Sequence, residues 1–298
     1  MTRSAIFHRT VSVAGTEIFY REAGDKGAPV IVLLHGFPSS SHMFRNLIPE
    51  LANRYHVIAP DLPGFGLSAM PPADRFAYTF ANFAKVVAAF LNQIEVERYA
   101  LYLMDYGAPT GLRLALDHPD SIAALIIQNG NAYEDGMGAF WDQTRAYWAD
   151  NGPANRDGMR PFLTVDGTRF QYLTGAHDPA RIDPAAWLYD QLFLDRPGAA
   201  EIQLDIIYDY RTSVALYPAI HAYFRQYRPP TLVLWGANDP IFLTAGAQAY
   251  LRDLPEAELH FFDTGHFALE ERADQMIPIM RDFLARSLSN NVQSNQGE

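Results

Sequence analysis

Three residues that lie far apart in the chain carry the side chains needed for a covalent hydrolytic reaction: Asp105, Asp239 and His266. A carboxylate can act as a nucleophile, an imidazole can deprotonate a water molecule, and a second carboxylate can orient that imidazole. Their order along the chain is nucleophile, acid, base. With Asp105 as the nucleophile, the covalent intermediate would be an ester of its carboxylate.

Asp105 sits where a strand is expected to turn sharply into a helix. Residues 99–104 form an apolar run, and Asp105 and Gly107 follow it directly. This pattern is typical of a nucleophile elbow, which raises one side chain at the carboxyl end of a strand. An Asp in this position can also simply cap the following helix. The other two residues therefore matter for the interpretation.

Asp239 and His266 follow strand-like stretches as well, at residues 230–236 and 258–262. Taken singly, Asp239 reads as a turn residue before a proline, and His266 as a polar loop residue. The carboxyl ends of parallel strands meet at one edge of a sheet, where ligands bind. Three reactive side chains at such strand ends therefore favour a catalytic site over three unrelated roles.

The chain alternates strand-like and helix-like stretches, which predicts an α/β fold with a mostly parallel sheet. Strands are expected in a hairpin at residues 10–19 and then at residues 30–34, 55–60, 99–104, 122–128, 230–236 and 258–262. Helices are expected at residues 42–51, 80–94, 111–116, 245–251 and 273–288.

The pattern changes between residues 132 and 229. Aromatic residues recur there among helix-like segments, and short β-branched runs are missing. We interpret residues 132–229 as a helical cap inserted after the sixth strand, over a core built from residues 1–131 and 230–288. The tail at residues 289–298 is rich in Ser, Asn and Gln, and is predicted to be disordered.

Composition narrows the classes of partner. The 298 residues carry a net charge of −11 and no cluster of Lys and Arg, which argues against nucleic-acid binding. No stretch has the length and apolarity of a membrane span or a signal peptide, so we expect a cytoplasmic protein that does not bind membranes. There is no Cys, and the nine His show no metal-ligand spacing, so we expect neither a cofactor nor a metal.

The chain resembles the α/β-hydrolase superfamily over nearly its whole length, and within it the epoxide hydrolase and haloalkane dehalogenase branch that uses an aspartate nucleophile. The resemblance rests on H-G-F-P at residues 35–38, D-L-P-G-F-G-L-S at residues 61–68, D-Y-G at residues 105–107, Asp239 and His266. It implies an eight-stranded, mostly parallel sheet flanked by helices, a helical cap, a small apolar organic substrate, and a monomer or homodimer.

The resemblance also implies roles for further residues. The backbone N–H groups of Phe37 and Tyr106 would form the oxyanion hole. An epoxide hydrolase takes its proton donors from the cap, where Tyr210 is the first candidate because Asp209-Tyr210-Arg211 looks like the Tyr-Arg element of that family. Tyr147, or its neighbour Trp148, is the candidate for a second donor. The substrate pocket is expected to include His35, Trp141 and Trp148.

Three functions remain open. Hydrolysis of an epoxide to a diol is favoured because Tyr106 stands where many dehalogenases carry a Trp whose N–H holds the halide. Haloalkane dehalogenation is the alternative, and Leu103 favours it because many epoxide hydrolases have Gly at that position. A binding protein without activity is the third, although such a protein would not need Asp105, Asp239 and His266 together.

Overall fold

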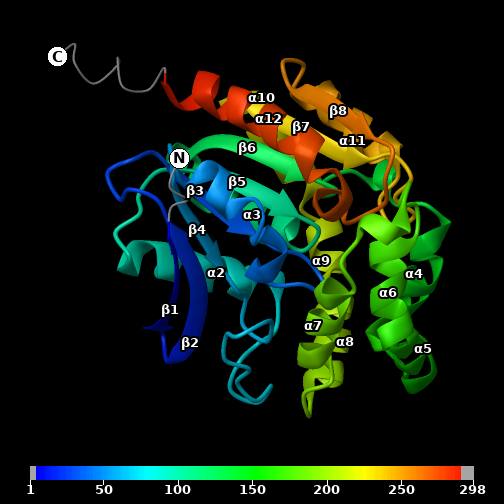
Figure 1. Cartoon of the computed structure of the whole chain (residues 1–298). Coiled ribbons are helices and arrows are strands. Elements are labelled where there is room, and N and C mark those ends of the chain that lie inside the picture. Colours follow the sequence, from blue (N-terminus) through cyan, green and yellow to red (C-terminus); the bar gives the residue numbers. More distant parts are fainter. Residues whose placement is uncertain (1–4, 290–298) are drawn as a thin grey trace.

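The structure is a computed structural model that describes residues 5–289 (Figure 1). An eight-stranded sheet forms its centre, in the order β1-β2-β4-β3-β5-β6-β7-β8. β1 and β2 form an antiparallel hairpin, β2 pairs antiparallel with β4, and all further pairs are parallel. The strands are β1 (Ile6–Val13), β2 (Thr16–Ala23), β3 (Val30–Leu34), β4 (His56–Pro60), β5 (Tyr99–Met104), β6 (Ile122–Gln128), β7 (Thr231–Gly236) and β8 (Glu258–Phe262). The predicted mostly parallel α/β-hydrolase sheet is confirmed.

The central strands are apolar throughout because both faces of the sheet are covered. Successive side chains of a strand point to opposite faces. In β5, Leu101 and Leu103 enter one hydrophobic core, and Tyr102 and Met104 enter the other. All four side chains are buried. A strand between two cores therefore reads as a continuous apolar run, which is why its limits were visible in the sequence.

Helices cover both faces of the sheet. The first core includes apolar residues of α2 (Phe80–Gln93), α3 (Gly107–Asp117), α10 (Tyr217–Tyr227) and α11 (Thr244–Asp253). The second includes residues of α1 (Ile48–Leu51) and α12 (Ala268–Ser289). The single helix expected at residues 42–51 is instead a 3₁₀ turn, Ser41–Phe44, followed by the short α1. Pro49 lies at the beginning of α1, where a proline is tolerated because the first helical N–H groups need no partner within the helix.

The segment between β6 and β7 is helical throughout its regular elements, as expected. Most of these helices group together beyond the arrowheads of β5 and β6 (Figure 1). α10 instead packs against α3 and α11, beside the sheet, although it lies within residues 132–229, the range predicted for the cap. The helices of the segment are α4 (Asp142–Ala149), α5 (Pro153–Gly158), α6 (Val165–Leu173), α7 (Pro184–Leu194), α8 (Ala199–Asp209), α9 (Arg211–Val214) and α10; four 3₁₀ turns accompany them, at Glu134–Gly136, Ala139–Trp141, Arg160–Leu163 and Pro179–Arg181.

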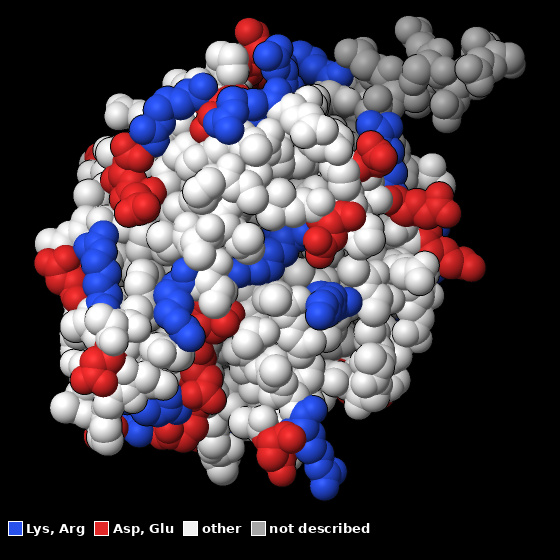
Figure 2. Space-filling model, turned by 180° about the vertical axis from the view of Figure 1, so that it is seen from behind, with Lys and Arg blue, Asp and Glu red and all other residues white. Residues whose placement is uncertain are grey.

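Basic and acidic side chains lie beside one another in small groups on the face that Figure 2 shows. Ion pairs among the described residues include Arg225 with Asp253 and Arg156 with Glu201. Within residues 5–289, no helix is both long and apolar enough to cross a membrane. Of the tail predicted to be disordered, Ser289 ends α12 and residues 290–298 lie outside the described part of the chain.

Candidate active site

Asp105 stands on a tight turn between β5 and α3. Its backbone φ is +46°, in the left-handed region that non-glycine residues seldom adopt. The turn brings Asp105 so close to Gly36 that a Cβ atom at Gly36 would lie 2.3 Å from the Cβ of Asp105. A glycine is therefore required beside Asp105. This is the geometry that the elbow pattern predicts.

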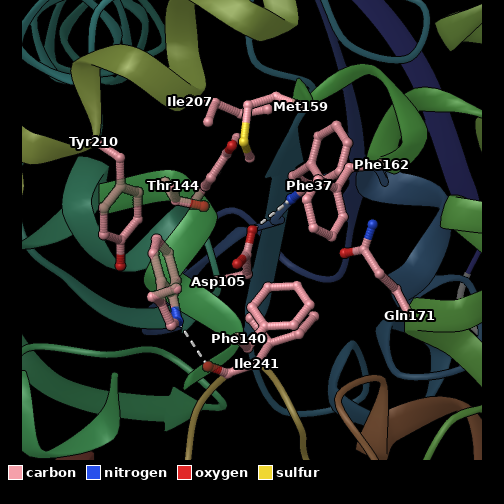
Figure 3. Close-up of a pocket in the computed structure, with 12 residues that line it drawn as sticks. Phe37, Asp105, Phe140, Thr144, Met159, Phe162, Gln171, Ile207, Tyr210 and Ile241 are labelled. Carbon is pink, nitrogen blue, oxygen red and sulfur yellow. Dashed lines mark hydrogen bonds between the residues drawn. The ribbon is translucent and has the colours of Figure 1, made fainter. Parts of the chain in front are cut away.

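The two carboxylate oxygens of Asp105 have different surroundings. Oδ1 accepts a hydrogen bond of 2.7 Å from the backbone N–H of Phe37 (Figure 3). Burial raises the pKa of Asp105, and the charge of His266 and the N–H groups of Phe37 and Tyr106 oppose this increase. Oδ2 lies 3.8 Å from Nε2 of His266, which is beyond hydrogen-bond distance. Oδ2 is therefore the oxygen that faces His266 without a hydrogen bond to it.

His266 lies in the loop between β8 and α12 and is fully buried. Its Nδ1 lies 2.8 Å from Oδ2 of Asp239. Its Nε2 is buried and has no hydrogen-bond partner among the described residues. Burial lowers the pKa of His266, but the charge and hydrogen bond of Asp239, together with the charge of Asp105, outweigh burial and raise it. The structure thus brings together all three residues predicted to form the triad.

Asp239 is held by backbone and side-chain donors. The N–H of Ile241 donates to its Oδ1 at 2.7 Å, and Nδ2 of Asn129 donates to its Oδ2 at 2.7 Å. Asn129 itself accepts from the N–H of Gly236 at 3.0 Å and is fully buried. Asn129 directly follows the strand predicted at residues 122–128 and was not among the predicted site residues. Its position directly after a strand of the same sheet edge was the signal that could have identified it.

A pocket lies in front of Asp105, between the sheet edge and the inserted helices (Figure 3). Most of its wall is aromatic or aliphatic, so it suits a small apolar molecule. The lining residues are Phe37, Asp105, Tyr106, Phe140, Trp141, Thr144, Met159, Phe162, Gln171, Ile207, Tyr210 and Ile241. Of the residues predicted for the pocket or for proton donation, Trp141 and Tyr210 lie here.

Tyr210 directly follows α8 as its C-terminal capping residue and is buried beside Tyr106, with ring centroids 6.1 Å apart. Within the described chain its hydroxyl has no partner at ordinary hydrogen-bond geometry, although the hydroxyl of Tyr217 is close enough to interact with it. Burial, the phenol of Tyr217 and the charge of Asp105 raise the pKa of Tyr210 far above its usual value. The phenol therefore stays protonated and can donate a proton or hydrogen bond to a molecule in the pocket.

Tyr147 and Trp148 were also predicted for the site, but they lie outside this lining. The hydroxyl of Tyr147 donates to the carbonyl of Leu204 at 3.2 Å and accepts from Arg156 at 2.9 Å. Trp148 stacks on Tyr210, and its indole N–H donates to the carbonyl of Ile207 at 2.8 Å.

His35 is buried behind the site and joins two loops. Its Nδ1 lies 3.0 Å from the carbonyl oxygen of Gly36, and its Nε2 accepts from the N–H of Leu62 at 3.0 Å. Burial lowers the pKa of His35, which keeps the ring neutral. The residue thus supports the loop that carries Phe37, and it does not line the pocket.

Comparison with known proteins agrees with this fold. A family model described as alpha/beta hydrolase fold matches residues 29–180 and 209–273. An uncharacterized hydrolase of Saccharomyces cerevisiae is 43% identical over 270 residues, which is 89% of this chain and 92% of that protein. A haloalkane dehalogenase of Mycobacterium marinum is 39% identical over 127 residues, which is 40% of this chain and 42% of the dehalogenase.

Solved structures share the whole architecture at lower identity. The crystal structure of DBJA has a TM-score of 0.79 and 23% identity, over 96% of this chain and 99% of DBJA. The epoxide hydrolase CorEH has a TM-score of 0.77 and 21% identity, over 95% of this chain and 99% of CorEH. Together with the family model and the yeast relative, the sheet and its strand-end residues lead to one conclusion: this chain is a hydrolase that belongs to the α/β-hydrolase superfamily.

Proposed function

We propose that this protein hydrolyses epoxides to vicinal diols through a covalent ester on Asp105. The observation that carries the proposal is the buried phenol of Tyr210, which lines the same pocket as Asp105 and makes no hydrogen bond of ordinary geometry within residues 5–289. Opening an epoxide leaves the departing oxygen attached to the substrate as an alkoxide, and this oxygen needs an acid. Tyr210 supplies one.

In the first step, Oδ2 of Asp105 attacks an epoxide carbon and the ring C–O bond breaks. The electron pair of that bond passes to the epoxide oxygen, which takes the proton of Tyr210. Because the charge of Asp105 is one cause of the raised pKa of Tyr210, the phenol becomes a stronger acid as this charge moves to the substrate. The product of the step is a hydroxyalkyl ester of Asp105.

In the second step, Nε2 of His266 takes a proton from water and the hydroxide adds to the carboxyl carbon of the ester. Oδ1 becomes the oxyanion of the tetrahedral intermediate, and the N–H groups of Phe37 and Tyr106 stabilise it. The intermediate collapses as the bond from the carboxyl carbon to the alkyl oxygen breaks, and the diol leaves with the proton held by His266. The remaining proton of the attacking water, left on the carboxyl group of Asp105, passes through solvent to the phenolate of Tyr210, which restores both groups. One epoxide and one water give one diol.

Haloalkane dehalogenation is the second candidate, and the partial similarity to a haloalkane dehalogenase favours it. A halide leaves as an anion and is held by N–H donors. Trp141 lines the pocket, but its indole N–H donates to the carbonyl oxygen of Ile241 at 2.8 Å. The indole N–H of Trp148 likewise donates to the carbonyl oxygen of Ile207. Both indole groups are therefore occupied, which favours the epoxide.

The experiment is a parallel assay of the purified protein with styrene oxide and related epoxides, and with a series of bromoalkanes. Diol release with little bromide release supports the proposal. Bromide release without diol formation would reverse the order of the two candidates.

A further inference from the structure

Gln171 places a second polar group in the pocket, and neither step of the proposed reaction uses it. It lies on α6, lines the pocket, and is 4% exposed. Its Nε2 is buried and has no hydrogen-bond partner among residues 5–289. A buried amide nitrogen without an acceptor is unfavourable, and such groups in proteins are usually satisfied by a protein group, water or a ligand.

The helix that carries Gln171 is fixed in place by its neighbours. Tyr172 stacks on Phe267 with ring centroids 3.8 Å apart, and its hydroxyl donates to Asp190 of α7. Thr168 donates to Gln191, also of α7, at 2.7 Å. Thr168 and Tyr172 lie on either side of Gln171 in the sequence, and their contacts fix α6 against α7 and against Phe267, the residue after His266. The carboxamide is therefore presented to the pocket from a rigid support.

Figure 3 shows Gln171 and Tyr210 on opposite sides of Asp105. A substrate whose epoxide oxygen meets Tyr210 thus extends its other end toward Gln171. The pocket wall on that side includes Phe162, whose side chain offers no hydrogen bond (Figure 3). A carboxamide has two N–H donors and one acceptor, and rotation by 180° exchanges nitrogen and oxygen without a change of shape. Gln171 can accordingly direct an N–H at the bound molecule.

We propose that Gln171 is a specificity-determining residue that binds a carbonyl oxygen of the substrate, so that the preferred substrate is an apolar epoxide bearing a carbonyl group away from the ring. This inference rests on the proposed function for the epoxide, but the carbonyl site itself does not require any reaction. A substrate with a methylene group in place of the carbonyl would leave the amide nitrogen unpaired. We expect a carbonyl preference of about tenfold or more.

The first arm of the test measures binding without an epoxide. The probes are 2-heptanone and 2-methyl-1-heptene, which differ by C=O against C=CH₂, and calorimetry gives their dissociation constants. The wild-type protein should bind the ketone about tenfold more tightly. Gln171→Met keeps the length of the side chain but removes the amide, so it should remove the preference and keep the affinity for the alkene.

Gln203→Met is the matched control. Gln203 is a buried glutamine of α8 whose Oε1 also has no partner in the described chain, but it does not line the pocket. This variant should keep the ketone preference. An unchanged preference in Gln171→Met, or no preference in the wild-type protein, would overturn the proposal.

A measurement on the wild-type protein protects the test against a variant that fails to fold. The side-chain amide protons of Gln171 should shift downfield in the NMR spectrum on saturation with the ketone, and not with the alkene. No shift at saturation counts against the proposal.

The second arm compares kcat/KM for epoxy ketones of increasing chain length with that for their methylene analogues. A ketone preference in binding without turnover of any epoxide would reject the proposed function and retain the carbonyl site. Turnover of both series at equal rates, without a preference in binding, would support the proposed function and reject the carbonyl site.

Discussion

The backbone N–H of Phe37 donates a 2.7 Å hydrogen bond to Oδ1 of Asp105, and this bond gives the two oxygens of one carboxylate different surroundings. Oδ1 is the oxygen that would become the carbonyl oxygen of the ester, and it already accepts a hydrogen bond at the position where an oxyanion would need stabilisation. The other oxygen faces His266. A serine nucleophile has one oxygen and cannot divide these roles, so the arrangement suits attack on an sp³ carbon followed by hydrolysis at the carboxyl carbon.

Replacement of Tyr210 by Phe tests the proton donor. The phenol should matter when an alkoxide leaves and matter little when bromide leaves. We expect Tyr210→Phe to slow alkylation by an epoxide about a hundredfold, measured by rapid mixing with enzyme in excess. Tyr147→Phe is the control, because the hydroxyl of Tyr147 is bonded to Leu204 and Arg156, and it should cost less than about threefold. Equal losses in the two variants would remove Tyr210 from the mechanism.

Asn129 should act through Asp239. The Asn129→Ala variant loses the 2.7 Å hydrogen bond to Asp239 and frees the carboxylate that orients His266. A hydrogen bond to a charged group contributes about 1.5–3 kcal/mol, so kcat should fall by about ten- to a hundredfold, with KM little changed. Asn238→Ala, at an exposed asparagine beside Asp239, should retain activity. A KM effect alone in Asn129→Ala would contradict this role.

The charge of Asp105 is one cause of the raised pKa of His266, and this gives a pH prediction. In Asp105→Asn the charge is gone, so the pKa of His266 should be lower than in the wild-type protein. The ester intermediate is also neutral at Asp105, so the imidazole becomes available as a base in the step that needs it. NMR titration of the His266 ring in both proteins measures the difference. An equal or higher pKa in the variant would show that Asp105 does not act on His266 in this way.

Asp190 should make the stability of the protein depend on pH. Burial raises its pKa to about 8, partly opposed by the hydrogen bond from Tyr172. The folded state therefore holds a proton that the unfolded state releases, and this stabilisation is present below about pH 4 and is lost as pH rises to about 8. Relative to Asp190→Asn, the free energy of unfolding of the wild-type protein should decline by at most about 1.4 kcal/mol per pH unit in that window. Urea denaturation at several pH values measures both slopes, and equal slopes would refute the prediction.

The sequence predicted the sheet and the proximity of Asp105, Asp239 and His266 because both depend on local patterns. The limits of β3, β5 and β6 match the predicted runs, since a strand buried on both faces is apolar throughout and ends at Gly, Pro or polar residues. The limits of β8, which is only partly buried, match as well. Strand order then brings the three strand ends to one edge without further information.

The cap side of the pocket could not be predicted in this way. On α4 the pocket meets Thr144, whereas Tyr147, one turn further, pairs with Arg156 of α5. Which face of such a helix meets the core depends on its neighbours, and apolar residues lie on several faces of these helices. Gln171 was overlooked for a related reason. A glutamine within a helix has no sequence pattern that marks it as a binding residue. The feature that marks Gln171 is its buried amide nitrogen without a hydrogen-bond partner, and only the packed structure shows it.

The central claim is the covalent ester on Asp105, and the mass of the peptide containing Asp105 tests it most directly. The His266→Gln variant lacks the base for the second step, so incubation with an epoxide that the wild-type protein hydrolyses should increase that mass by one epoxide molecule. A variant with Asp105→Ala in addition should show no increase. Full steady-state turnover by His266→Gln, or an unmodified Asp105 peptide after incubation with that epoxide, would contradict the account.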